Sequence, residues 1–424
     1  MWNGGAFSGT KIALICETSL IAYLRDHKEG IPFPGMWDLP GGGSRHGPAD
    51  RRGAGPALIS PGPAARRTRS RHAWSGHEGR AHLDLLVILE PEDAAFAPAA
   101  QAVADGRIPG AALGLVTADG RTAVRITGSA AIVPDREALT RDHWFDLASV
   151  SKVIATTTMI LTLAEQGRLD LDRPLTDAIP DLRQYDVAHA AERRLTFRDC
   201  LAHRTFLPAV EPIYTYGDDP ARLRAFVLQR EWRHGPAVYS DINFILLGIA
   251  IERITGAPLS DWPLGEGLSF GPPPGPAVAT EACSWRGRVL KGEVHDENAY
   301  ALGGAPGHAG LFGTVDGVLA FARAMLDGSI LSTKMMAQVR TAQEGHRTCG
   351  WERAFPGWSG GDACSAETIG HTGFTGTGLW IDFDRGLAWT LLTNRVHPSR
   401  HADSGIFTLR PAVGDALIRA WDQE

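Results

Sequence analysis

The chain lacks the features that mark several classes of protein. Its five cysteines are an odd number and include no Cys-x-x-Cys pair, which argues against a disulfide framework and a structural zinc site. No apolar run approaches the roughly 20 residues that a membrane-spanning helix needs. The net charge of -6 is small and acidic, which argues against a nucleic-acid surface. These exclusions leave a globular protein as the expected class. Its 44% hydrophobic and 21% charged residues are ordinary for an enzyme.

The N-terminus does not have the pattern of a secretory signal. The apolar stretch from Ile12 to Leu24 is interrupted by Glu17 and has no basic start. Scattered single cysteines suit a reducing compartment. We therefore expect a cytoplasmic protein, and a periplasmic one only if translation begins further upstream.

The composition changes along the chain and predicts three parts. Residues 44–90 are rich in arginine, proline, alanine and glycine, and offer little apolar area to offset chain entropy. We expect this stretch to be a poorly ordered linker between a short segment, 1–43, and a large domain, 91–424. The total of 424 residues is enough for two or three domains, or for one large domain with an appendage.

The short first segment resembles the start of a Nudix hydrolase. The strand-like residues 11–22 and the loop Gly35-Met-Trp-Asp-Leu-Pro-Gly-Gly-Gly43 match the lead into that family's catalytic box. The glutamates that would hold Mg²⁺ do not follow, because no glutamate occurs between Glu29 and Glu78. We interpret 1–43 as a Nudix-like remnant; an ordered accessory region and a working second enzyme are the alternatives.

The large domain shows an α+β pattern. Helices are predicted over 96–105, 151–167 and 411–421, and strands over 111–117, 123–127, 379–383 and 386–393. Asp119-Gly120 marks a hairpin turn between the first two strands. Helices at both ends around antiparallel strands indicate α+β.

Ser149 and Lys152 are the first candidate catalytic pair. Their i, i+3 spacing puts both side chains on one face of a helix. Ser149 would lie at the helix start, where free N–H groups stabilise negative charge. A serine hydroxyl needs a base, and burial among Val150, Val153 and Ile154 would lower the pKa of a lysine enough to serve.

Three other patterns carry less information. Ser8 and Lys11 repeat the same spacing in a glycine-rich stretch that predicts no helix. Ser269 lies in a Gly-x-Ser-x-Gly pattern, but three prolines follow and exclude the helix that a nucleophile elbow needs. The run His295-Asp296-Glu297 with His308 fits no zinc spacing, so we expect neither a metal nor a cofactor.

Two further motifs follow Ser149 in a specific order. Tyr239-Ser240-Asp241 comes first, and His371-Thr372-Gly373 comes second. This order resembles the class C β-lactamase and penicillin-binding-protein family of serine hydrolases over roughly residues 92–424. The stretch 292–312 resembles its esterase and penicillin-binding-protein-4B-like branch.

The resemblance implies a fold and a set of roles. The fold would be β-lactamase/transpeptidase-like, an antiparallel sheet flanked by helices with an all-helical subdomain. Ser149 would be the nucleophile and Lys152 its partner. Tyr239 would move a proton to the leaving group, with its pKa lowered by the charge of the lysine. The backbone N–H groups of Ser149 and Phe374 would form the oxyanion hole. Substrate contacts are expected from Asp241, Asn298, His371, Thr372, Gly373 and Phe374.

Two departures from the family pattern bear on the substrate. Asp241 stands where asparagine is common, and an ionised aspartate cannot donate to a substrate carbonyl. His371 stands where lactamases usually have lysine, and it holds a carboxylate less firmly. Both favour an esterase or a D-amino-acid peptidase or carboxypeptidase acting on a small ester, amide or peptide. The alternatives are a β-lactamase and a penicillin-binding module that is acylated without turnover.

Overall fold

The structure is a computed structural model that describes residues 13–16, 19–24, 37–38 and 90–423. The chain divides into two compact units, residues 1–88 and 89–424. In the first unit, β1 (Ala13–Cys16), β2 (Ser19–Leu24) and β3 (Trp37–Asp38) pair as an antiparallel sheet. The rest of the Nudix-like segment, and the predicted linker apart from Glu90, lie outside the described residues.

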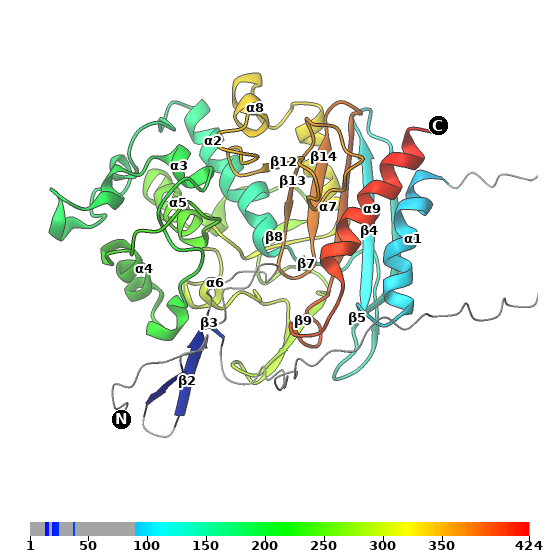
Figure 1. Cartoon of the computed structure of the whole chain (residues 1–424), viewed down its shortest axis with the longest axis horizontal. Helices are drawn as coiled ribbons and strands as arrows, with labels where there is room; N and C mark the ends of the chain where they lie inside the picture. The colour runs from blue at the N-terminus through cyan, green and yellow to red at the C-terminus, as the bar shows by residue number, and fades with distance from the viewer. Residues whose placement is uncertain (1–12, 17–18, 25–36, 39–89, 424) are drawn as a thin grey trace, which may run out of the picture. The chain divides into compact units, whose positions relative to one another are not determined.

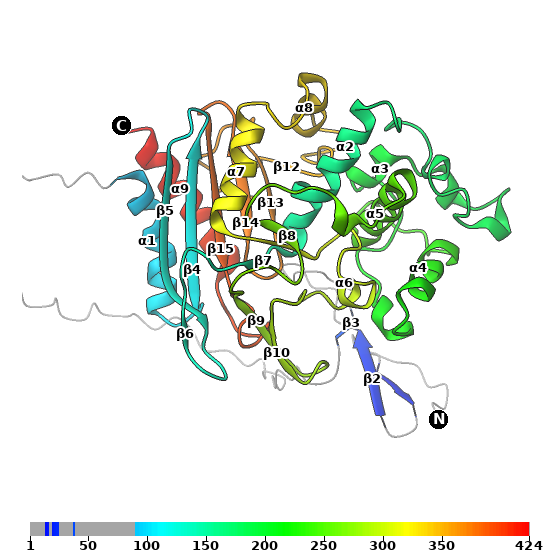
Figure 2. The ribbon, with the colours of Figure 1, turned by 180° about the vertical axis from the view of Figure 1, so that it is seen from behind.

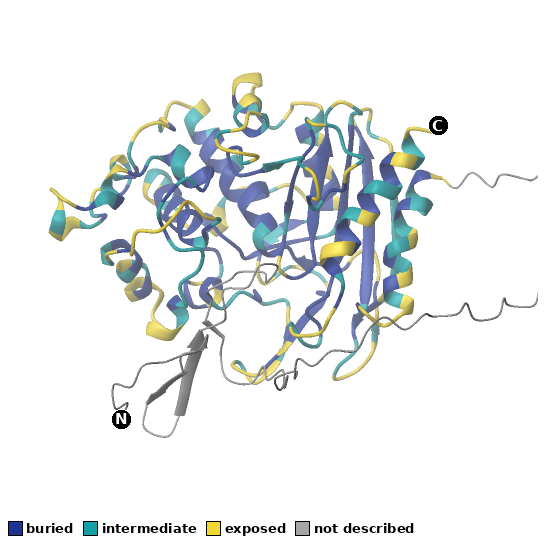
Figure 3. Ribbon diagram, viewed as in Figure 1, coloured by how far each residue is buried: buried dark blue, intermediate teal, exposed yellow. Residues whose placement is uncertain are grey.

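A seven-stranded antiparallel sheet forms the centre of the second unit. Its strands in spatial order are β12 (Glu352–Arg353), β13 (Ile369–Thr372), β14 (Gly378–Asp382), β15 (Leu387–Thr393), β4 (Gly110–Thr117), β5 (Thr122–Ala131) and β6 (Glu137–Ala138). Helices cover both faces, so the central strands are buried along their whole length, as Figure 3 shows. A strand that is buried on both faces has a nearly continuous apolar sequence instead of alternating apolar and polar residues.

The two faces of the sheet are covered by different helices. Figure 1 shows α1 (Pro91–Ala104) and α9 (Ile406–Trp421) together on one face. The view from behind in Figure 2 shows α7 (Val315–Leu326) on the other face. A side chain at Gly114 of β4 would meet Val315 of α7 at 2.7 Å, so this glycine permits the close approach of helix and strand.

A helical subdomain lies at one side of the sheet (Figure 1). Its α-helices are α2 (Thr158–Glu165), α3 (Phe197–Leu201), α4 (Pro220–Gln229) and α5 (Asp241–Thr255). Short helical turns connect them: η3 (Leu175–Asp177), η4 (Gln184–Asp186), η5 (Ala191–Arg194), η6 (Ile213–Tyr216) and η7 (Leu259–Asp261). Helix α5 is buried from Ile242 to Ile251, which makes it the core of the subdomain.

Small elements join the sheet to the subdomain. A three-stranded sheet contains β7 (Phe145–Asp146), β11 (Leu311–Gly313) and β8 (Leu268–Phe270). A hairpin contains β9 (Ala279–Cys283) and β10 (Arg288–Lys291), and two further helices are α6 (Glu297–Ala301) and α8 (Thr333–Arg340). No helix among the described residues is long and apolar enough to cross a membrane.

The predicted α+β fold is confirmed, with differences at particular elements. The hairpin of β4 and β5 and the pairing of β14 with β15 are as predicted. Helix α9 begins at Ile406, five residues before the predicted start, because Ile406 and Leu409 are buried against the sheet and Pro411 is accommodated inside the helix. The predicted helix over 151–167 is instead a π-helical segment, η2 (Lys152–Thr157), followed by α2.

Helix α9 also contributes a buried arginine that reaches the end of β13. Arg410 is 5% exposed, and its Nη2 donates to the backbone oxygens of Gly373 and Thr377, each at 2.7 Å. Both oxygens belong to the turn between β13 and β14, so this one side chain ties the helix to that turn. Removing it would leave both carbonyl groups buried without this donor.

We expect Arg410→Leu to lower the free energy of unfolding by about 2–4 kcal/mol, because two hydrogen bonds from a charged donor, worth about 1.5–3 kcal/mol each, are lost, while the cost of burying that charge is also removed. Denaturant unfolding at neutral pH measures the change. Arg419→Leu on the same helix is the matched control, since its side chain is 70% exposed. That control should stay within about 0.5 kcal/mol of the parent. Equal midpoints for the two variants would contradict this role of Arg410.

Candidate active site

Ser149 lies in a tight turn that is held by the carboxylate of Asp146. The turn is the 3-10 segment η1 (Ala148–Val150), and it follows directly after β7. Asp146 Oδ1 accepts from the N–H of Ala148 at 2.8 Å, and Oδ2 accepts from the N–H of His295 at 2.6 Å. Ala148 has a left-handed φ of 46°, a conformation that costs energy in a residue other than glycine. The residue before Ser149 is therefore strained, and Ser149 itself remains partly exposed.

The amino group of Lys152 touches three oxygens from separate parts of the chain. It lies 2.9 Å from Ser149 Oγ, 2.9 Å from the backbone oxygen of His308 and 2.7 Å from Asp241 Oδ1. The side chain of Lys152 is 0% exposed. The predicted pair is thus brought together, on a 3-10 turn and the start of a π-helix rather than on one regular α-helix. Such π-helical segments occur frequently at functional sites.

A glycine-rich loop makes the contact with His308 possible. Gly304, Gly307 and Gly310 all have left-handed φ angles, between 94° and 109°. A Cβ on Gly307 would lie 2.4 Å from the backbone oxygen of Phe244 in α5. The loop also binds η2, because Thr156 Oγ1 donates to Gly307 O at 2.6 Å. The loop therefore passes between η2 and α5 at Gly307, where a Cβ would not fit.

Tyr239 lies beside Lys152, just before α5 begins. Its ring centroid is 5.0 Å from Lys152 Nζ, and its ring packs against His203 at 4.5 Å and His371 at 5.9 Å. The guanidinium of Arg347 lies 5.2 Å from the same ring centroid. The buried Tyr239 hydroxyl makes no hydrogen bond with any of the described residues. It is therefore available to form a hydrogen bond with a substrate or leaving group.

Asp241 lies beside Lys152. Its Oδ1 forms the ion pair with Lys152 described above, and its side chain is only 14% exposed. The substrate contact that we expected of it stays a prediction. Asp241 is the first residue of α5, where the positive end of the helix dipole favours a carboxylate. The carboxylate is thus already engaged by a buried cation.

Asn298, for which we also expected a substrate contact, binds backbone groups of a neighbouring segment in this structure. Its Oδ1 accepts from the N–H of Tyr214 at 3.1 Å, and its Nδ2 donates to the oxygen of Glu211 at 2.7 Å. The residue is 5% exposed. Both polar ends of the amide bind the segment 211–214 and hold it against α6.

The strand β13 brings His371, Thr372 and Gly373 to the same region. A Cβ on Gly373 would lie 2.4 Å from Leu147 O and 3.3 Å from Ala148 Cβ, so the strand end is in contact with the Ser149 turn. Thr375 Oγ1 donates to Asp146 O at 2.7 Å, and Thr377 Oγ1 donates to Leu147 O at 3.0 Å. The two segments that would supply oxyanion donors are therefore joined directly.

Phe374 is oriented by its neighbours and is 40% exposed. Arg395 Nε donates to the Phe374 oxygen at 2.7 Å, and its guanidinium lies 4.5 Å from the ring centroid. The ring of His295 stacks on the ring of Phe374, with the two ring centroids 5.7 Å apart. The oxyanion role of the Phe374 and Ser149 N–H groups stays a prediction.

The electrostatics correct two of our pKa expectations. Burial alone lowers the pKa of Lys152, but Asp241 and Tyr239 outweigh it and raise that pKa above its ordinary value. Burial raises the pKa of Tyr239, and the charge of Lys152 does not overcome this. We expected both pKa values to be lowered. Lys152 is therefore an ammonium and Tyr239 a neutral phenol in the free protein.

His371 is neutral in this environment. Burial lowers its pKa well below the ordinary value, and the charges of Lys152 and Arg347 lower it further. Its Nδ1 donates to the backbone oxygen of Thr372 at 3.0 Å, which leaves Nε2 as an acceptor. A neutral imidazole cannot offer a cation to a substrate carboxylate.

The acidic and histidine side chains near Lys152 are already paired. Asp241, Asp296 and His308 place ligand atoms within 4.8 Å of one another. His308 Nε2 donates to Asp296 Oδ1 at 2.8 Å, Asp296 caps α6, and Asp241 binds Lys152. A cation at this point would compete with the Lys152 ammonium, so the donor set fits a proton-bearing lysine better than a metal.

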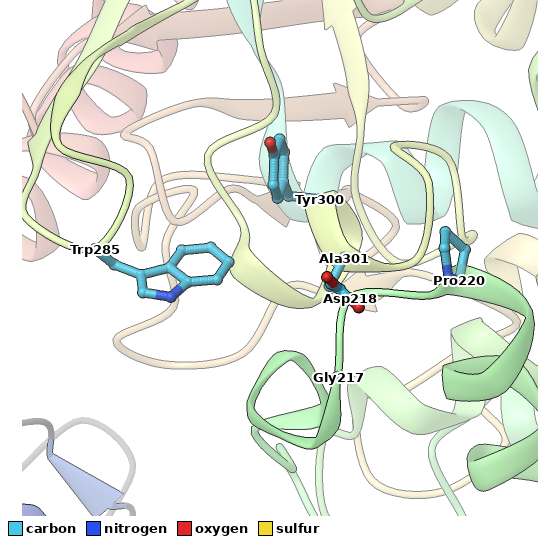
Figure 4. A pocket seen from close by; sticks show the side chains of 6 residues that line it. All are labelled: Gly217, Asp218, Pro220, Trp285, Tyr300 and Ala301. Atoms are coloured by element: carbon cyan, nitrogen blue, oxygen red, sulfur yellow. The ribbon is translucent and has the colours of Figure 1, made fainter.

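An aromatic hollow of about 240 Å³ lies beside α6 (Figure 4). Trp285 and Tyr300 form part of its wall and are 46% and 43% exposed. The rest of the lining is contributed by Gly217, Asp218, Pro220 and Ala301. Ala301, which lines the hollow, is the last residue of α6, the same helix that contains Asn298.

The sequence analysis missed several residues of this site. Asp146, His203 and Arg410 carry no motif of their own, and they act by holding backbone groups or packing on Tyr239. Asp146 lies only three residues before Ser149, and this short spacing could have indicated that it contacts the Ser149 turn. The other residues are too distant in sequence to be associated with the site before folding.

Comparison with known proteins identifies the class. The Beta-lactamase family matches residues 97–410. N-acetylmuramyl-L-alanine amidase of Bacillus subtilis (strain 168) is 30% identical over 301 residues, covering 60% of this chain and 68% of that relative. A putative D-alanyl-D-alanine carboxypeptidase of Escherichia coli (strain K12) is 28% identical over 301 residues, covering 60% and 69%.

A solved structure shows the same fold. EstCE1, a hydrolase with promiscuous acyltransferase activity, superposes with a TM-score of 0.61 at 19% identity, covering 77% of this chain and 98% of that one. The fold and these matches define a serine hydrolase with a β-lactamase/transpeptidase-like architecture. The chain belongs to the Beta-lactamase family.

We expect Gly373→Ala to reduce the rate of Ser149 acylation by about 100-fold, because a displacement of about 1 Å at a reacting centre can cost that much. The added Cβ would lie 2.2 Å from Thr377 Oγ1 and 2.4 Å from Leu147 O, so the strand end must move. Labelling by a fluorophosphonate, followed by intact mass, measures the rate.

Gly265→Ala is the control for this variant, since a Cβ there meets no atom within 4 Å. Its labelling rate should equal that of the parent. A Gly373→Ala protein that labels as fast as the control would show that the contact with the Ser149 turn is unimportant.

Proposed function

We propose that Ser149 is the nucleophile of an acyl-enzyme hydrolase and that Lys152 and Tyr239 move its proton. The observation that carries the proposal is the 2.9 Å contact between Lys152 Nζ and Ser149 Oγ, made by a lysine that is fully buried. A buried lysine in contact with a serine hydroxyl is the arrangement that activates a weak nucleophile. The strained Ala148 and the Asp146 carboxylate hold the hydroxyl in place.

The steps follow from the positions of these groups. Ser149 Oγ attacks the substrate carbonyl, and the carbonyl electrons move to the oxygen, which the N–H groups of Ser149 and Phe374 stabilise. Once the Lys152–Tyr239 pair has lost one proton to solvent, it accepts the serine proton and returns it through Tyr239 to the leaving alcohol or amine. Water then attacks the acyl-enzyme by the same path in reverse.

The proposed substrate is a small ester or a peptide-like amide. The two curated relatives are named for an N-acetylmuramyl-L-alanine amidase and a putative D-alanyl-D-alanine carboxypeptidase, and both names describe compounds of alanine. The neutral His371 supports a substrate other than a β-lactam, because it offers no cation to the lactam carboxylate. An acylated alanine amide is therefore the first natural substrate to test.

We expect Ser149→Ala to lose at least about 1,000-fold in kcat/KM, since removing a nucleophile removes the covalent route. Hydrolysis of p-nitrophenyl esters and of acylated alanine amides measures the loss. Ser269→Ala is the matched control, because Ser269 lies within β8 and donates to the oxygen of Phe270.

The same experiment separates the alternatives. Nitrocefin turnover faster than ester turnover would identify a β-lactamase. A stable adduct on Ser149 without turnover, detected by intact mass, would identify a non-catalytic penicillin-binding module. Full activity in Ser149→Ala would refute the proposed nucleophile.

We also infer that residues 1–43 are a Nudix-like remnant without pyrophosphohydrolase activity. The support is the sequence alone, in which no glutamate lies between Glu29 and Glu78 to hold Mg²⁺. The full chain incubated with Mg²⁺ and nucleoside diphosphate compounds should release no phosphate or nucleotide above the blank. Release by the full chain at a rate proportional to its concentration would overturn this inference.

A further inference from the structure

The three contacts of the Lys152 amino group suit both of its protonation states. As an ammonium it donates to Ser149 Oγ and to His308 O, and its charge lies 2.7 Å from Asp241 Oδ1 in an ion pair. As a neutral amine it would keep its donation to His308 O, and would accept the serine proton through its lone pair. No other rearrangement is needed between the resting state and the reactive state.

Asp241 is the group that favours the first state over the second. It is the carboxylate in ion-pair contact with Lys152 among the described residues, at 2.7 Å. Its position is rigid, because its own N–H donates to Ala209 O at 2.9 Å and Ser240 Oγ donates to Pro208 O at 2.6 Å. An opposite charge held this close to a buried ammonium stabilises the protonated form.

The other polar groups around Lys152 do not replace Asp241. His203 and His371 are neutral, since burial lowers the pKa of each well below its ordinary value. Asp296 is paired with His308, and Arg347 is a cation that lies over the ring of Tyr239. Tyr239 is a neutral phenol because burial raises its pKa.

We propose that Asp241 is a positioning residue that acts as the counter-ion of Lys152, and that this ion pair sets the alkaline pH range in which Ser149 becomes reactive. The inference rests on the proposed nucleophilic role of Ser149. One proton must leave the Lys152–Tyr239 pair before that pair can accept the serine proton. The negative charge of Asp241 opposes this loss, so the reactive form accumulates only as the pH rises.

The proton balance of the acylation step is as follows. The pair, lacking one proton, takes the proton of the Ser149 hydroxyl while the bond between Oγ and the carbonyl carbon forms. The bond to the leaving group then breaks, its electrons remain on the leaving group, and the pair returns the proton to it. The pair is regenerated in the form in which it began.

The test is the pH dependence of kcat/KM in Asp241→Asn, measured with a p-nitrophenyl ester between pH 6 and pH 10. This substitution keeps the shape of the side chain and removes its charge. Removing the anion destabilises the ammonium, so the ascending limb should move toward lower pH by about 1–3 units. For kcat/KM the limb reports the free enzyme.

Two controls accompany this variant. Asp316→Asn removes one carboxylate from an exposed ion pair with Arg141 and should leave the limb in place. Asp241→Glu keeps the negative charge and should return the limb toward the parent position. A merely structural role of Asp241 would change the rate at every pH without moving the limb.

The outcomes separate this inference from the proposed function. An unmoved limb in a folded Asp241→Asn protein that still labels at Ser149 would overturn the counter-ion role and leave the nucleophile intact. A parent enzyme that fails to label at Ser149 would refute the proposed function itself. If Asp241→Asn does not fold, the pH dependence of kcat/KM in the parent enzyme tests the inference instead. A kcat/KM that does not change between pH 6 and pH 9 would contradict it.

Discussion

The buried amino group of Lys152 is the constraint on which the rest of the site depends. A charge removed from water is tolerated only when it is paired and hydrogen-bonded. Here the partners come from the Ser149 turn, from the loop at His308 and from the first residue of α5. These three parts must converge on one point, and glycines in the loop 304–310 allow the approach.

The sheet side of the site is built by close backbone contacts rather than by charge. Gly373 leaves room for Leu147 O, the two threonines after it bind the backbone before Ser149, and Arg410 holds the turn from α9. The strain at Ala148 persists because the surrounding contacts determine its conformation. Ser149 is thus positioned between the strand end at Gly373 and a buried ion pair.

The charge distribution explains why the family name alone does not define the substrate. Asp241 is neutralised by Lys152, and His371 is neutral because it is buried beside two cations. His371 offers no cation to a substrate carboxylate, and the carboxylate of Asp241 is already held in an ion pair. The exposed Phe374 is an apolar side chain next to the Ser149 turn, and Trp285 and Tyr300 are exposed aromatic side chains at the hollow beside α6.

The amino-acid sequence was sufficient to predict the α+β class, the hairpin of β4 and β5, and the group of Ser149, Lys152, Tyr239 and His371, because periodicity and ordered motifs are local signals. Contacts between distant segments established the ion-pair partner of Lys152, the bond between Asn298 and the segment 211–214, and the early start of α9. Lys152 and Asp241 are 89 positions apart in the sequence. The direction of a pKa shift depends on which charges folding brings within a few ångströms, and no local pattern contains that information.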